Sequence, residues 1–149
     1  MVVQEETNGM PRMIHDTGEI LHKLTARLWD RPFQDYLSSD DFTRFCRDNG
    51  LSDEWRKYLE LCRDNPALLG DSSVQKHAFF LFLAHVYHHM PERFLFLLTR
   101  LLLDFSRGIS CDLPVEEIRS SLLDLGYPQE NVDAAVSLLI KREVSQPGM

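Results

Sequence analysis

Three histidines, His85, His88 and His89, form the sharpest candidate for chemistry in this sequence. In a helix His85 and His89 lie one turn apart with His88 beside them, close enough for two imidazoles to share a metal ion. A zinc or iron site needs more ligands from another helix, and neither HExxH nor paired Glu-x-x-His segments occur. We therefore expect no cofactor. We interpret the histidines as the water-facing side of an apolar helix and keep a metal-dependent helical protein or enzyme as an alternative.

Other catalytic signatures are missing from the sequence. It contains neither the GxSxG turn of serine hydrolases nor a GxGxxG or GxxxxGK[ST] phosphate loop. The cysteines Cys46, Cys62 and Cys111 form no CxxC pair and leave one thiol unpaired, which favours a reducing compartment. We predict a cytoplasmic protein without catalytic residues.

Net charge limits the possible partners. The chain of 149 residues carries a net charge of −7, which repels phosphate backbones unless its arginines gather on one face. A nucleic-acid-associated subunit is therefore one alternative, and an acidic nucleic-acid mimic is another. The first would need the arginines Arg27, Arg31, Arg44, Arg47, Arg56, Arg63 and Arg107 to converge, and the second would use Asp40, Asp41, Asp48, Asp53 and Glu54.

The elements that must position these side chains are helices, because period-two alternation is nowhere sustained. We predict an all-α, compact bundle of six or seven helices in all, around a central apolar hairpin at about 74–107. Within it the main bundle covers 11–110, a helix pair at 113–142 packs on it, and flexible tails cover 1–10 and 145–149. A first helix is expected over 17–29, with Pro32 marking its end. Ser39 and Ser52 are expected to mark the starts of later helices, and the segment Asp71-Ser72-Ser73 is expected to open the helix that follows it.

Residues 74–107 hold much of the apolar surface, as two helical stretches joined at Met90-Pro91. Charged and histidine residues interrupt them, so we expect no membrane span, which needs about 20 uninterrupted apolar residues. The second stretch is apolar over most of its circumference and must be covered by the core or by a partner. The residues expected there are Phe94, Leu98, Leu101, Leu102 and Phe105. This favours a non-enzymatic protein-protein interaction module that binds another protein or itself as a homo-oligomer.

The C-terminal segment 117–136 reads EIRSSLLDLGYPQENVDAAV, with an apolar-Gly-aromatic turn at Leu125-Gly126-Tyr127. It resembles the first two helices of a ubiquitin-associated (UBA-like) domain. The resemblance implies that Leu125 and Tyr127 contribute to a small docking patch. An ordinary helix pair, in which Gly126 ends one helix and Pro128 precedes the next, is the alternative.

Overall fold

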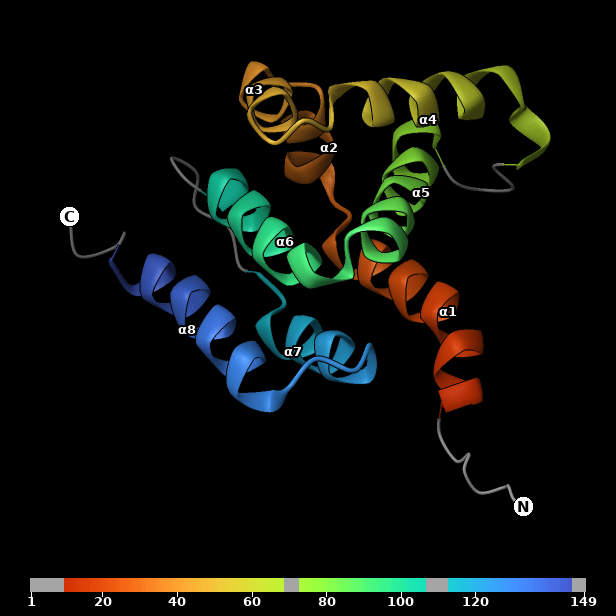
Figure 1. Ribbon diagram of the computed structural model, residues 1–149. Coiled ribbons are helices and arrows are strands. Elements are labelled where there is room, and N and C mark those ends of the chain that lie inside the picture. The colour runs from red at the N-terminus through yellow and green to blue at the C-terminus, as the bar shows by residue number, and fades with distance from the viewer. Residues whose placement is uncertain (1–9, 69–72, 107–112, 146–149) are drawn as a thin grey trace.

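A computed structural model describes residues 10–68, 73–106 and 113–145, and its described part is made of α-helices and one short 3-10 helix (Figure 1). The all-α prediction is confirmed. Both predicted tails lie almost wholly outside the described residues, as do Arg107 and Cys111. The helices are α1 (Met10–Leu28), α2 (Arg31–Leu37), α3 (Asp40–Asp48), α4 (Ser52–Asp64), η1 (Pro66–Leu68), α5 (Val74–His89), α6 (Pro91–Ser106), α7 (Val115–Asp124) and α8 (Gln129–Ser145).

The central hairpin is formed by α5 and α6, as expected. The Ser73 hydroxyl accepts the Lys76 amide hydrogen (3.1 Å), which caps α5. The helix ends at Met90, and Pro91 begins α6, where its missing N–H removes no internal hydrogen bond. The two helices therefore meet at the predicted joint.

The first two helices differ from expectation. Helix α1 begins at Met10, seven residues before the predicted start, and Pro32 does not mark its end. Pro32 instead lies in the first turn of α2, a helix that we did not predict, because a proline is tolerated there. The Asp30 carboxylate accepts the Phe33 amide hydrogen (2.8 Å) and caps this extra helix. The described helices therefore number eight, counting α-helices only.

Local signals also set the start of α3 and α4. The Ser39 hydroxyl accepts the Phe42 amide hydrogen (3.3 Å), so the predicted cap of α3 is confirmed. Gly50, just after the end of α3, has a φ of +70°, a left-handed conformation that glycine adopts without strain. Ser52 is not a cap, because it is already the first residue of α4. The buried Leu51 occupies the cap position without a side-chain hydrogen bond.

Aromatic side chains form the centre of the core. The ring of Phe33, from α2, is fully buried and meets Phe79 of α5 (5.1 Å between centroids) and Phe105 of α6 (4.9 Å), both edge to face. Such geometry aligns the positive ring edge with the negative ring face of the neighbour. The unpredicted helix α2 therefore supplies one of the main anchors of the central hairpin.

The C-terminal pair belongs to the same core. Helix α7 packs against α1, and α8 packs against α6 and α7 (Figure 1). Ile118, Val132 and Leu139 are buried in the hydrophobic cluster that also includes the central hairpin. None of the described helices is long and apolar enough to cross a membrane.

Candidate functional site

The five apolar residues predicted for core or partner binding lie in the core. Each has an exposed fraction of 4% or less, because α2, α3, α5 and α8 cover the faces of α6 that carry them. These side chains therefore pack inside the molecule and are not accessible to a partner. They are Phe94, Leu98, Leu101, Leu102 and Phe105.

The turn between α7 and α8 is bound to the central hairpin. Tyr127 donates its hydroxyl hydrogen to the Pro91 carbonyl oxygen (2.7 Å), and Tyr87 donates its own to the Leu125 carbonyl oxygen (2.9 Å). The Tyr127 ring also stacks on Phe94, at 6.2 Å between centroids. Burial, followed by the proximity of Tyr87, raises the pKa of Tyr127. Leu125 is buried and Tyr127 is half-buried, so both contact their own chain, while the UBA-like resemblance stays a prediction.

The predicted histidine group separates into a bonded pair and an exposed neighbour. The rings of His85 and His89 stack at 4.2 Å, and His85 Nδ1 lies 3.0 Å from the Tyr58 hydroxyl oxygen. His89 donates its Nδ1 hydrogen to the His85 carbonyl oxygen (3.0 Å), and His88 is exposed. Burial and the neighbouring His89 lower the pKa of His85. Within the described ranges, no three His, Cys, Asp or Glu side chains are grouped so that they could hold a metal ion.

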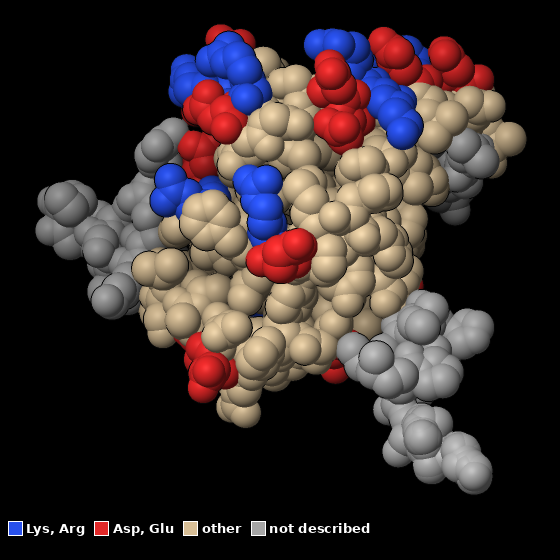
Figure 2. Space-filling model, in the orientation of Figure 1, with Lys and Arg blue, Asp and Glu red and all other residues tan. Residues whose placement is uncertain are grey.

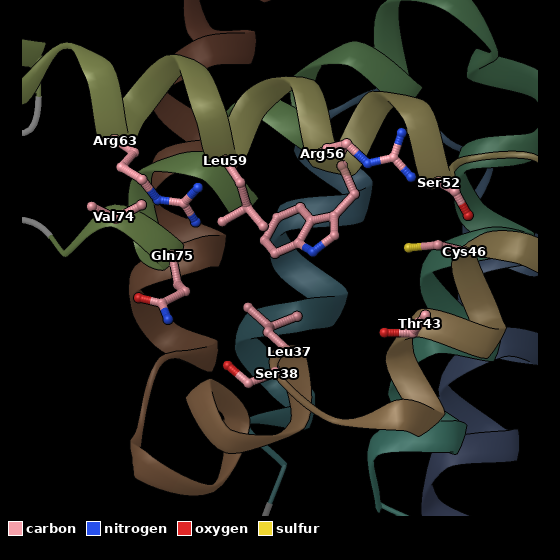
Figure 3. Close-up of a pocket in the computed structure, with 11 residues that line it drawn as sticks. Leu37, Ser38, Thr43, Cys46, Ser52, Arg56, Leu59, Arg63, Val74 and Gln75 are labelled. Atoms are coloured by element: carbon pink, nitrogen blue, oxygen red, sulfur yellow. The ribbon is translucent and has the colours of Figure 1, made fainter.

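A concave site that was not predicted lies beneath α4 (Figure 3). Helix α4 forms its roof, the end of α2 its floor, and α3 and the first turn of α5 its two sides. Its volume is about 510 Å³. We call this site the α4 groove. It is lined by Leu37, Ser38, Thr43, Cys46, Ser52, Trp55, Arg56, Leu59, Arg63, Val74 and Gln75.

The lengths of the surrounding helices explain the groove. Helix α2 has only seven residues, and the chain turns after Leu37, where Ser39 donates its hydroxyl hydrogen to the Tyr36 carbonyl oxygen (2.6 Å). Helix α4 has thirteen residues and extends past the end of α3. Trp55 fixes α4 to the core through edge-to-face contacts with Phe42 (5.2 Å) and Phe82 (5.6 Å). The overhanging part of α4 therefore covers a space that the shorter helices do not fill.

The groove combines apolar surface with positive charge. Among the described residues that line it, the charged side chains are Arg56 and Arg63, and none is Asp or Glu. Burial raises the pKa of the Cys46 thiol to about 12, so this cysteine is a neutral, weakly polar part of the wall. Hydroxyl and amide groups from α2, α3, α4 and α5 supply hydrogen-bond donors and acceptors. The arrangement is suited to binding, and it places no base beside a nucleophile.

A sequence signal for the groove existed on α4. Ser52, Arg56, Leu59 and Arg63 follow one another at spacings of four, three and four residues, so they share one helical face. The acids of α4 lie on the rest of its circumference by the same count of 3.6 residues per turn. Because arginines and acids alternate along the chain, their separation onto different faces of α4 was not recognised from the sequence.

The charges on the visible face do not form a broad field of one sign. Figure 2 shows Lys and Arg side chains beside Asp and Glu side chains along the edge formed by α3 and α4. Arg44 lies 3.1 Å from Asp41, and Arg56 lies 3.4 Å from Asp53, in each case within one helix. Positive and negative side chains are therefore interleaved at the surface proposed for both nucleic-acid alternatives.

Comparisons with known proteins add no family to this description. No protein-family model matches the chain, and neither a curated protein nor a solved structure matches it. The functional argument therefore depends on the site itself.

Proposed function

We propose that this protein is a non-enzymatic protein-binding module, and that the α4 groove is its binding site. The observation that carries the proposal is the composition of this groove: Trp55 and Leu59 provide apolar contact next to two arginines. Tryptophan and arginine are the side chains that most often dominate the free energy of protein-protein binding. A groove between helices that presents such side chains is also a common mode of peptide recognition.

The location of the groove supports the same function. Helix α4 packs on α3, η1 and α5 at the edge of the bundle, and Cys62 is its only fully covered side chain. A partner could contact the open part of α4 without displacing any core residue. Binding through the five buried α6 residues predicted for an interface would instead require Phe94 and its neighbours to leave the core, at a cost of roughly several kcal/mol per large side chain.

The proposal is tested by comparing partners captured by three forms of the protein. Leu59→Gln removes apolar surface from the groove without adding charge, and Leu138→Gln makes the same change on α8, where the leucine side chain is 50% exposed. We expect the wild type and Leu138→Gln to retain a specific partner that Leu59→Gln loses, as measured by affinity capture and quantitative mass spectrometry. Circular dichroism controls for folding of each variant.

The opposite pattern would contradict the proposal. If Leu59→Gln is folded and retains every specific partner, the α4 groove is not the binding site. If Leu138→Gln loses the partner instead, the C-terminal helix pair carries the interaction, as the UBA-like resemblance implies.

A further inference from the structure

We infer that the α4 groove recognises an acidic, apolar peptide segment of another protein, in which carboxylates flank an apolar side chain. This inference rests on the proposed function and specifies the chemistry of the partner. Its basis is the contrast between a chain of net charge −7 and a groove whose charged lining residues, within the described ranges, are both arginines. An acidic segment is repelled by the net charge of the chain and attracted by the two arginines of this groove.

Both arginines are available to a ligand. Arg63 makes no ion pair with any described residue, and Figure 3 shows its side chain directed from α4 toward the first turn of α5. Among the described residues Arg56 forms an ion pair with Asp53 alone, at 3.4 Å, and the side chains of this pair are 66% and 89% exposed. An exposed ion pair within one helix contributes little to the free energy of folding. Replacing Asp53 by a ligand carboxylate as the partner of Arg56 therefore costs little free energy. Each guanidinium can therefore bind a carboxylate through two parallel hydrogen bonds.

The spacing of the two arginines specifies the ligand further. Arg56 and Arg63 are seven residues apart, which places them about 10 Å apart along α4 on the same face. Leu59 lies between them, so its apolar contact falls between the two positive groups. Trp55 lies one turn before Leu59 and adds apolar surface next to Arg56. A matching ligand carries two acidic groups about 10 Å apart with an apolar side chain between them. That distance corresponds to about two helical turns or about three residues of extended chain.

The neutral part of the groove favours a peptide over a purely anionic ligand. Ser38, Thr43, Ser52 and Gln75 offer hydrogen-bonding groups along its walls, which suit the backbone amides and carbonyls of a bound segment. The protonated Cys46 adds no negative charge to oppose it. Leu37 extends the apolar surface to the floor of the groove, and Val74 extends it to the side formed by α5.

The test is a selection from a displayed library of random peptides, using the full chain as bait. We expect the enriched peptides to combine Asp or Glu with Leu, Phe, Met or Trp, and to bind more weakly as salt is raised, because salt screens exposed charges. Arg56→Glu and Arg63→Glu should each weaken the best peptide about tenfold, while Arg63→Lys, which keeps the charge, should weaken it less. Fluorescence anisotropy measures these affinities.

Arg44→Glu is the matched control. Arg44 is an exposed arginine that pairs with an acid three residues before it, as Arg56 does, and it lies outside the α4 groove. The substitution changes the net charge of the chain by the same amount as Arg56→Glu or Arg63→Glu. We expect it to leave the affinity within about twofold, since the local potential in the groove is unchanged.

Two other results separate the inference from the proposed function. Peptides that lose affinity for Leu59→Gln but contain no enriched acids, and that bind Arg56→Glu and Arg63→Glu normally, would overturn the ligand chemistry and leave the groove as a binding site. Failure to enrich any peptide, or enrichment of peptides that bind Leu59→Gln as well as the wild type, would overturn both.

Discussion

Tyr58 and His85 join α4 to α5 through a single polar contact, and His85 in turn stacks on His89. The Tyr58 hydroxyl and His85 Nδ1 lie 3.0 Å apart, a distance that either protonation state of the imidazole tolerates. Protonation of His85, however, places a positive charge in a partly buried position next to another histidine, and this costs free energy. The contact is therefore a structural link between the helix that roofs the groove and the core.

This environment predicts how the free energy of unfolding depends on pH. Burial lowers the pKa of both His77 and His85, with further contributions from His22 and His89 respectively. Around His85, Glu54 raises the pKa and Lys57 lowers it, and the net shift is downward. The unfolded chain therefore binds more protons than the folded chain just below the ordinary histidine pKa of about 6.5. Stability should be constant above this pH and decrease as the pH falls through it.

Urea unfolding between pH 7.5 and pH 5.5 measures this effect. We expect the paired substitution His77→Gln and His85→Gln to flatten the decrease, because it removes the groups whose protonation opposes folding. His88→Gln, at an exposed position on the same helix, should leave the decrease unchanged. An equal slope in the wild type and the paired variant would assign the pH dependence to other groups.

At the scale of elements, two tyrosines hold the α7–α8 turn on the α5–α6 joint. Each hydroxyl donates to a backbone carbonyl of the other segment, and the Tyr87 and Tyr127 rings lie 6.2 Å apart. We expect Tyr87→Phe and Tyr127→Phe each to lower the free energy of unfolding by about 1 kcal/mol, since each removes one hydrogen bond between the turn and the hairpin. The losses should not be additive, because the two side chains are in contact.

Hydrogen exchange locates the effect of these substitutions. Amides of α7 and α8 should exchange faster in both variants, while amides of α3, which lies on the far side of α6, should keep their rates. A uniform acceleration in all helices would mean that the turn has no local role. Unchanged stability in both variants would mean that the hydroxyls do not contribute to docking.

The elements also show how far the sequence determines this fold. The Ser39 and Ser73 caps and the Met90-Pro91 joint are local signals, and each is found where the sequence placed it. Helix α2 was missed because Pro32 was interpreted as a stop, whereas Asp30 makes it the first turn of a new helix. A proline next to an acidic cap is compatible with the end of one helix and with the first turn of another. The burial of Phe33, which the sequence alone does not show, decides between them.

At the scale of the whole molecule, the five α6 residues predicted for the core or an interface are covered, while Phe96 on the same helix stays 59% exposed. Sequence periodicity could not decide between cover from the same chain and cover from a partner. The structure provides the cover through helices far away in the sequence, including α8. The α4 groove depends on the same long-range arrangement: Leu37, Cys46, Leu59 and Val74 come from four helices, and no local pattern brings them together.

The interior of the molecule and its proposed binding site overlap only in part. Core residues such as Phe94 and Phe105 are buried away from the α4 groove, whose residues we propose to determine recognition. Trp55 belongs to both, since its ring contacts Phe42 and Phe82 and also lines the groove. For this reason Leu59, Arg56 and Arg63 are better positions than Trp55 for testing binding without loss of fold.

The most direct test of the central claim is an NMR titration of the labelled full chain with the strongest peptide from the library selection. We predict that shift changes concentrate at the Trp55 indole and at backbone amides of residues 37–46, 52–63 and 74–75. Resonances of α7 and α8 should stay in place. Shift changes centred on α7 and α8, or spread through the core with the Trp55 indole unmoved, would contradict the assignment of the α4 groove as the binding site.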